Sequence, residues 1–279
     1  MSAGIRASKA LGQHFLHDQR VLERIAAFAK PPPGSGLLEI GPGTGNLTEW
    51  LLAHGGPFIT IERDRRMLAP LRERFGDDFE LIHGDAARAD YGLLLARPEM
   101  GPSPVVVGNL PYNAAVPILF RLLEARPGPA RIVIMLQKEV ARRLAATAST
   151  SDYGQLSVKV QMVADVRILL RVGRGAFAPP PKVESAVVAV TPLNAWRHAV
   201  PDRDRFTRLL VAGFAQRRKT LARALHNNVG LAPATVHDAL VAIGHDHRAR
   251  AEALSVAQWA DLALGLDPAL MAAMATEQK

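Results

Sequence analysis

Short apolar runs alternate with stretches of helical spacing through the first half of the chain. The runs, which favour β-strands, are residues 37–41, 58–62, 79–83, 105–109 and 132–137. They are almost continuously apolar, which is typical of parallel strands buried on both faces. Between them, apolar residues recur three or four positions apart, as Leu47 and Leu51 do. Strands that alternate with helices predict βαβ units in a doubly wound, Rossmann-like α/β sheet.

The rest of the chain divides into a sheet edge and a helical region. A helix over residues 18–29 precedes the sheet and ends at a run of three prolines, which cannot continue it. Residues 166–172 and 185–191 are predicted as two further strands on either side of a proline-rich loop. After the second of them only helical spacing remains. We therefore predict an α/β domain over residues 1–195 and a small α-helical domain over residues 196–279.

The charge balance restricts the partner only loosely. Lys and Arg number 34 against 26 Asp and Glu, a net charge of +8, which suits nucleic acid, an anionic membrane or an acidic protein. The absence of cysteine excludes disulfides, thiolate catalysis and Cys-based metal sites. No apolar run approaches the roughly 18 residues of a membrane span. We expect a soluble, cytoplasmic monomer that has neither a metal site nor a membrane contact.

A glycine-rich loop follows the first predicted strand. Gly41, Gly43 and Gly45 have GxGxG spacing, so the backbone can turn sharply and a ligand can approach without meeting a Cβ. Glu62 ends the second strand and Asp85 follows the third, so both belong to the carboxyl edge of the sheet, where ligands bind. A carboxylate at the first of these positions can accept both ribose hydroxyls of a nucleoside. The loop alone would also fit a simple tight turn, but together these residues predict an adenosine-bearing ligand.

The end of the fourth strand predicts the chemistry. Asn109, Leu110 and Tyr112 offer an amide oxygen, a backbone carbonyl and an aromatic ring, and Pro111 biases Leu110 toward an extended conformation. Two acceptors suit an exocyclic amine, whose lone pair is delocalised into its base. Hydrogen bonds to both of its hydrogens would turn the lone pair toward an electrophile and stabilise the charge that develops on nitrogen. Tyr112 can stack on the base, which contributes about 1–3 kcal/mol.

Four motifs occur in order along the chain, at residues 12–16 (GQHFL), 39–43 (EIGPG), 109–113 (NLPYN) and 177–185 (FAPPPKVES). On these motifs the chain resembles the ribosomal RNA adenine N6-dimethyltransferases, and within that family the small-subunit (16S) enzymes known for kasugamycin sensitivity. The resemblance covers nearly the whole length. It implies S-adenosyl-L-methionine as methyl donor. It also implies that the substrate is a pair of adjacent adenines in a hairpin loop near the 3′ end of 16S rRNA, within a small ribosomal subunit or its precursor.

The resemblance also assigns residues to the cofactor, drawn from the first motif and the strand ends. These residues are His14, Leu16, Gly41, Gly43, Glu62, Asp85 and Asn109. It places His14 and Leu16 at the edge of the cofactor site, Gly41 against the methionine part, Glu62 on the ribose and Asp85 at the adenine amine. Many members of the family have Asn where this chain has His14.

For the target base, the resemblance assigns orientation of the amine to Asn109 and the Leu110 carbonyl. It implies that Tyr112 and Phe177 grip a flipped adenine between their rings, as enzymes that act on a base commonly do. Without the family, a Phe before three prolines is also typical of a loop anchor packed on the core. We expect direct methyl transfer with no general base.

A run of cations without an acid lies in the helical region, and it consists of Arg205, Arg208, Arg217, Arg218, Lys219 and Arg223. A solvated helix face is one interpretation of such a run. The other, which we favour, is a phosphate-binding face on a helical segment, with Arg217, Arg218, Lys219 and Arg223 as RNA contacts. Lys182 is expected near the backbone of the target RNA.

Three alternatives remain open at this point. A nicotinamide-dependent dehydrogenase would share the glycine loop and Glu62, but it predicts GxGxxG spacing and a proton-transfer residue. A non-catalytic RNA- or DNA-binding factor could keep the fold and dispense with Asn109. Within the family, a 23S rRNA adenine N6-methyltransferase would differ in substrate alone.

Overall fold

The computed structural model describes residues 7–8 and 12–277, and the chain divides into two compact units. The sheet unit comprises Met1–Ala141 and Asp165–Pro192, and the helical unit comprises Arg142–Ala164 and Leu193–Lys279. The predicted division at residue 195 assigned residues 142–164 to the α/β domain. In the structure this segment belongs to the helical unit.

The seven-stranded sheet has the order β4-β3-β2-β5-β6-β9-β7. Its strands are β2 (Leu37–Ile40), β3 (Phe58–Glu62), β4 (Glu80–His83), β5 (Val105–Asn109), β6 (Arg131–Gln137), β7 (Ala164–Val172) and β9 (Ser185–Pro192). The first five pair in parallel, and β9 runs antiparallel to β6. The predicted doubly wound α/β sheet is confirmed. Burial along the whole of β2 and β3 explains why both strands are mostly apolar.

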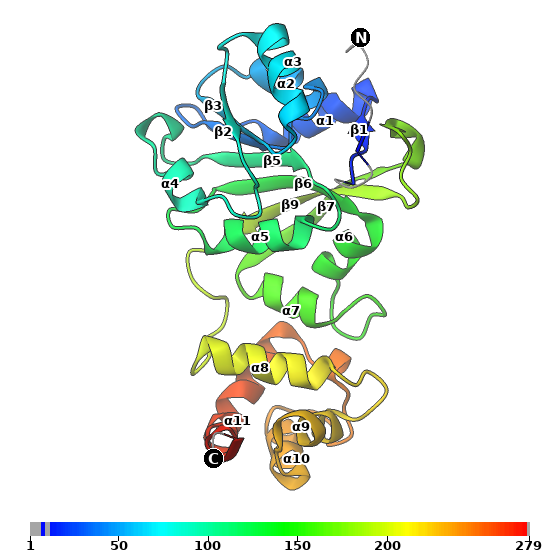
Figure 1. The fold of residues 1–279 in the computed structure, drawn as a ribbon. Coiled ribbons are helices and arrows are strands. Elements are labelled where there is room, and N and C mark those ends of the chain that lie inside the picture. The colour runs from blue at the N-terminus through cyan, green and yellow to red at the C-terminus, as the bar shows by residue number, and fades with distance from the viewer. Residues whose placement is uncertain (1–6, 9–11, 278–279) are drawn as a thin grey trace. The chain divides into compact units, whose positions relative to one another are not determined.

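Helices cover both faces of this sheet (Figure 1). In the sheet unit they are α1 (Gln19–Ala29), α2 (Asn46–Leu52), α3 (Arg65–Phe75), α4 (Tyr91–Leu95), α5 (Ala115–Glu124) and α6 (Lys138–Ala145), which continues into the helical unit. Helices α1, α2 and α3 lie on one face and α5 lies on the other. Asp18 starts α1 by accepting a hydrogen bond from the Val21 amide at 3.1 Å, and Pro31 follows its end.

The chain order of the strands creates a crevice at the carboxyl edge of the sheet. From β2 the chain moves outward through β3 and β4, then returns to place β5 on the other side of β2. The loops after β2 and β5 therefore leave in opposite directions. In open α/β sheets this switch point is where ligands bind.

A second, two-stranded sheet joins distant segments of the chain. Strand β1 (Phe15–Leu16) pairs antiparallel with β8 (Phe177–Ala178), with Phe15 opposite Ala178 and Leu16 opposite Phe177. Each strand is two residues long, too short to show any periodicity. Neither strand was therefore predicted from the sequence, and residues 177–178 were expected in the proline-rich loop.

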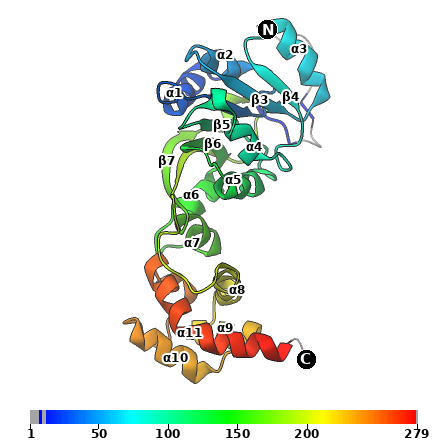
Figure 2. The same ribbon diagram turned by 90° about the vertical axis from the view of Figure 1, so that its left-hand side faces the viewer.

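The helical unit packs around its own apolar core. Its helices are α7 (Gln155–Gln161), α8 (Arg203–Phe214), α9 (Leu221–Val229), α10 (Pro233–Ala242) and α11 (Val256–Glu277). Figure 2 shows α9, α10 and α11 together. Tyr153, Val158 and Met162 are buried in one cluster with Phe206 and Trp259, which explains why residues 142–164 belong here.

Short 3-10 turns lie at Pro98–Met100, Arg174–Ala176 and Ala251–Ala253. Within the segments the structure describes, no helix is both long and apolar enough to cross a bilayer.

Candidate active site

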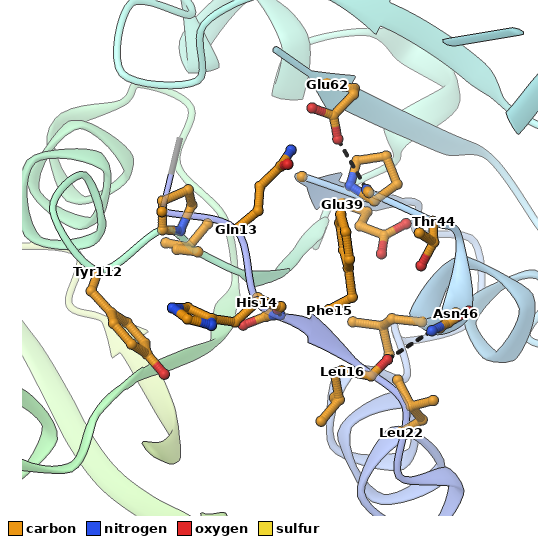
Figure 3. Close-up of a pocket in the computed structure, with 18 residues that line it drawn as sticks. Gln13, His14, Phe15, Leu16, Leu22, Glu39, Thr44, Asn46, Glu62 and Tyr112 are labelled. Atoms are coloured by element: carbon orange, nitrogen blue, oxygen red, sulfur yellow. Dashed lines mark hydrogen bonds between the residues drawn. The ribbon is translucent and has the colours of Figure 1, made fainter. Parts of the chain in front are cut away.

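A pocket with about 740 Å³ of atom-free space opens at the carboxyl edge of the sheet (Figure 3). Strand ends β2, β3 and β5 form its floor, and the segment 12–16 forms one wall. The lining residues are Gly12, Gln13, His14, Phe15, Leu16, Leu22, Glu39, Gly41, Pro42, Gly43, Thr44, Asn46, Leu47, Glu62, Asn109, Leu110, Pro111 and Tyr112.

The glycine loop after β2 approaches the pocket with its backbone. Gly43 has φ +56°, and a Cβ there would lie 3.2 Å from the Phe15 ring. Its amide donates a hydrogen bond to Glu62 Oε2 at 2.9 Å. Only glycine combines this conformation with so close a neighbour. The loop thus connects the first and second strand ends.

Two buried carboxyl groups line the pocket side by side. Glu62 is 5% exposed, and its other oxygen accepts the Asp64 amide at 2.7 Å. Glu39 is 1% exposed and accepts a hydrogen bond from Thr48 Oγ1 at 2.7 Å. Burial raises the pKa of both groups. The pKa of Glu39 is raised to about 8, mainly by burial, and the charge of Glu62 contributes to this increase.

No cation compensates this pair: within residues 7–8 and 12–277, neither Glu39 nor Glu62 forms an ion pair. Without a cation, a buried carboxyl favours its neutral form, as the raised pKa of Glu39 indicates, and a cationic ligand would favour the ionised form. The pocket is therefore suited to a ligand that carries positive charge and hydroxyl donors.

Asn109 at the end of β5 has a defined orientation. Its Nδ2 donates a hydrogen bond to the backbone carbonyl of His14 at 3.0 Å. A carbonyl can only accept, so the NH₂ group must face His14 and the amide oxygen must face away from it. The next residues complete this end of the pocket. Leu110 is 2% exposed, and the Tyr112 hydroxyl lies 2.6 Å from Ser185 Oγ.

The segment 12–16 is held in place at several points. Gln13 Nε2 donates to Asp64 Oδ2 at 2.9 Å, and Asn46 Nδ2 donates to the Leu16 carbonyl at 2.8 Å. Arg66 also binds Asp64, and its hydrogen bond lowers the pKa of this carboxyl to about 2. Asp64 therefore stays ionised, and its contacts persist across the neutral pH range.

The structure brings all but one of the predicted cofactor residues to the pocket wall. The residues there are His14, Leu16, Gly41, Gly43, Glu62 and Asn109. Asp85 is the exception: it faces Arg63 at 3.5 Å and accepts the Ala87 amide at 3.0 Å, and it is not among the lining residues. Its assignment to an adenine amine remains a prediction.

Phe177 lies in the core, not at the pocket wall. It is 3% exposed and packs in the cluster that contains Leu16 and Val172. Pairing with β1 turns this apolar ring inward, because burying a phenyl ring stabilises the fold. In this structure Phe177 therefore packs as a core anchor, and its assignment to the target adenine remains a prediction.

The predicted basic helix is divided in two. Helix α8 ends at Phe214 and α9 begins at Leu221, so Arg217, Arg218 and Lys219 lie in the connection between them. Arg205 is bound by Asp267 through two hydrogen bonds, of 2.7 and 3.1 Å.

Arg205 therefore forms an ion pair within the fold, and it is not one of the four residues named as RNA contacts. The four residues named as RNA contacts are exposed, as is Lys182 in the sheet unit. The acid that pairs Arg205 lies 62 residues away, so the local charge pattern could not reveal it.

Several pocket residues had no assigned role in the sequence analysis. Gln13, Phe15 and Asn46 belong to or follow recognised motifs, but their contacts join segments that are far apart. Glu39 carried a usable signal, because a glutamate inside an otherwise apolar strand must be either paired or functional.

The fold and the site together define an S-adenosylmethionine-dependent methyltransferase. The sheet has an antiparallel β9 beside β6, and the pocket is lined by a glycine turn after β2 and an acid at the end of β3. Two solved structures agree over most of the chain. A dimethyladenosine transferase from Plasmodium falciparum has a TM-score of 0.72 and 27% identity, covering 91% of this chain and 98% of its own. The 23S rRNA methyltransferase ErmE has a TM-score of 0.69 and 27% identity, covering 91% of this chain and 99% of its own.

The chain belongs to the ribosomal RNA adenine dimethylase family. The family described as "Ribosomal RNA adenine dimethylase" matches residues 4–267. The sequence is 46% identical over 264 residues to Ribosomal RNA small subunit methyltransferase A of Anaeromyxobacter sp. (strain K), covering 92% of this chain and 93% of the relative. It is 44% identical over 262 residues to the protein of that name from Geobacter metallireducens, covering 93% of this chain and 95% of the relative. The predicted family is confirmed, and a dehydrogenase is excluded.

Glu39→Gln tests the buried carboxyl through the pH dependence of stability. The folded pKa of about 8 exceeds the ordinary value of 4.5, so the folded protein keeps a proton that the unfolded chain releases. The contribution of Glu39 to stability is therefore complete below pH 4.5 and is lost as pH rises through about 8. Gln cannot ionise. The thermal midpoint of the variant should therefore rise relative to wild type as pH increases from about 5 to about 9.

Glu124→Gln, at an exposed position on α5, is the matched control and should follow wild type throughout. A constant difference between wild type and Glu39→Gln over the same pH range would show that Glu39 is ionised in the folded protein.

Proposed function

We propose that this enzyme transfers methyl groups from S-adenosylmethionine to the N6 amines of two adjacent adenines in a hairpin loop near the 3′ end of 16S rRNA. Each adenine is dimethylated, within a small ribosomal subunit or its precursor. The observation that carries the proposal is the orientation of Asn109, whose amide oxygen faces away from His14 at the end of β5. This is the acceptor that an adenine amine requires.

The pocket residues fit S-adenosylmethionine. Its ribose hydroxyls match Glu62, and its positive charge would favour the ionised form of the buried carboxyls Glu39 and Glu62. Gly41 and Gly43 allow close approach along the loop. When bound, the cofactor supplies a methyl group on a positively charged sulfur, which leaves as a neutral thioether.

Asn109 and the Leu110 carbonyl act on the target amine. In the first transfer each accepts one N–H, which draws the nitrogen lone pair out of the ring and directs it toward the incoming methyl group. In the second transfer one N–H remains for one of the two acceptors. As the N–C bond forms, positive charge develops on nitrogen, and both acceptors stabilise it by roughly 1.5–3 kcal/mol each. The surplus proton then leaves to water. Because the Asn109 amide is already held by His14, it need not reorganise during the reaction.

Tyr112 supports the base itself. Its hydroxyl contacts Ser185, which is fully buried, so the ring is fixed at the pocket entrance. A base extruded from an RNA loop can stack on that ring, which offsets part of the cost of unstacking.

The relatives named small-subunit methyltransferase support 16S rRNA as substrate. The ErmE likeness keeps 23S rRNA as the rival outcome of the test. Because ribosomal subunits are cytoplasmic particles in bacteria, we expect the enzyme to act there.

The exposed cations Arg217, Arg218, Lys219 and Arg223 are proposed to hold RNA phosphates. They lie between α8 and α9 and in the first turn of α9, and none of them is paired with an acid among the described residues. Four such contacts to single-stranded RNA would give a salt slope of about −0.7 × 4 ≈ −3. Lys182 is proposed to contact the backbone near the target.

Labelled methyl donor and purified ribosomal subunits test the reaction. Wild-type enzyme should label the small subunit, and Asn109→Ala should lower the rate by at least about a hundredfold while RNA binding persists. Asn113→Ala, an exposed neighbour outside the pocket lining, is the matched control. Label confined to the large subunit would overturn the assignment of 16S rRNA as substrate. Undiminished turnover by Asn109→Ala would overturn the proposed role of Asn109 in orienting the amine.

Charge reversal tests the RNA surface. Changing Arg217, Arg218 and Lys219 to Glu should reduce the steepness of the salt dependence of RNA binding by at least about 2. The same reversal at Arg20, Lys30 and Arg72, three exposed cations of the sheet unit, should change the slope far less. Equal changes for the two triple variants would mean that net charge, and not this surface, governs binding.

A further inference from the structure

Arg74, in the last turn of α3, binds the glycine-rich loop from outside the pocket. Its Nη1 donates a hydrogen bond to the backbone carbonyl of Thr44 at 3.0 Å. Its Nη2 donates to the carboxylate of Glu49, in the first turn of α2. The guanidinium also lies over the Phe75 ring, 4.8 Å from the ring centroid. One side chain therefore connects α3 both to the loop and to the helix that follows the loop.

The composition of the loop explains why it needs such a contact. Gly41, Gly43 and Gly45 have positive φ angles of +71°, +56° and +79°. Glycine adopts these angles without strain, but it also has many other conformations open to it, so ordering a loop with three glycines costs much entropy. The Gly43 amide is bound to Glu62 at the end of β3, and Arg74 supplies a contact from α3.

Arg74 acts on the peptide group of Thr44. The Thr44 side chain lines the pocket (Figure 3), whereas its carbonyl oxygen accepts the bond from Arg74, which is not among the lining residues. The neighbouring Gly45 packs tightly on α3, since a Cβ there would lie 2.5 Å from the Phe75 ring. The bond to Arg74 and this packing together fix the loop from the side of α3.

We propose that Arg74 is a positioning residue for the cofactor, which holds the glycine-rich loop in the conformation that binds S-adenosylmethionine. This assignment rests on the proposed function, because it requires the pocket to be the cofactor site. Without Arg74, a smaller fraction of the free enzyme has the loop in its binding conformation, and the apparent affinity falls by the same factor. A bound cofactor orders the loop itself, so the methyl transfer step is unaffected.

Three variants and a control separate this role from a general effect on the fold. Arg74→Ala removes both hydrogen bonds. Arg74→Lys keeps the charge but replaces the forked guanidinium by a single ammonium group. Glu49→Gln removes the ion pair and leaves the bond to the Thr44 carbonyl in place. The matched control is Arg72→Ala, which removes another exposed cation from the last turn of the same helix.

The dissociation constant of S-adenosylmethionine, measured by calorimetry, is the main measurement. Arg74→Ala should raise it by about threefold to thirtyfold, as expected for one partly exposed hydrogen bond from a charged donor. Arg74→Lys should give a smaller increase, and Glu49→Gln and Arg72→Ala should stay within about twofold of wild type. In the methyl transfer assay, KM for the cofactor should rise with the dissociation constant in Arg74→Ala, while the maximal rate stays the same.

Hydrogen exchange measured by mass spectrometry tests the loop itself. In the free Arg74→Ala protein, amides of the segment 41–49 should exchange faster than in wild type, and saturating cofactor should restore their protection. A residue that merely supports the fold would lower the thermal midpoint but would change neither the cofactor affinity nor this local exchange.

Three results would overturn the role of Arg74 while leaving the proposed function intact. They are an unchanged dissociation constant in Arg74→Ala, a lower maximal rate without weaker cofactor binding, and a loss of affinity in Glu49→Gln as large as that in Arg74→Ala. The last result would mean that the ion pair, and not the bond to the loop, governs affinity. If the wild-type enzyme bound no S-adenosylmethionine, the proposed function itself would fail, and the assignment of Arg74 with it.

Discussion

The hydrogen bond from Asn109 Nδ2 to the His14 carbonyl is the interaction on which the site depends. It joins the end of β5, at the switch point of the sheet, to a segment that precedes the first strand of that sheet by some twenty residues. One bond thereby closes one wall of the pocket and decides which way the amide oxygen faces. The other contacts of the segment, from Gln13 to Asp64 and from Asn46 to Leu16, hold the acceptor of this bond in place.

A second part of the pocket is defined by two buried carboxyl groups. Glu39 and Glu62 are buried together without a cation, an arrangement that raises the pKa of both and costs stability. Thr48 and two backbone amides offset part of that cost. We infer that a cationic ligand offsets the rest, so that the pocket gives up stability in the free enzyme for affinity toward its cofactor. Such trade-offs are common at functional sites.

The strands of the parallel sheet and the site residues at their ends could be predicted, because both depend on patterns within short segments of the sequence. Mostly apolar runs located the strands of the parallel sheet, with β3 and β5 correct to the residue. Strand order placed Glu62 and Asn109 at one edge, because parallel strands share a carboxyl end. What escaped prediction depends on partners distant in the chain: the β1–β8 ladder, the Arg205–Asp267 pair and the contact of Asp85 with Arg63. Phe177 was uncertain for the same reason, since only its pairing with Leu16 shows that its ring points inward.

Asn109→Asp tests most directly whether the amide must be oriented by His14. The variant keeps two oxygen acceptors for the target amine, but an ionised carboxylate cannot donate to the His14 carbonyl and is repelled by it. If the orienting bond matters, single-turnover methyl transfer at about pH 8 should fall at least about tenfold. It should recover in part as the pH is lowered and the carboxyl gains a proton to donate. A rate equal to wild type at about pH 8 would contradict this, because an oxygen acceptor alone would then suffice.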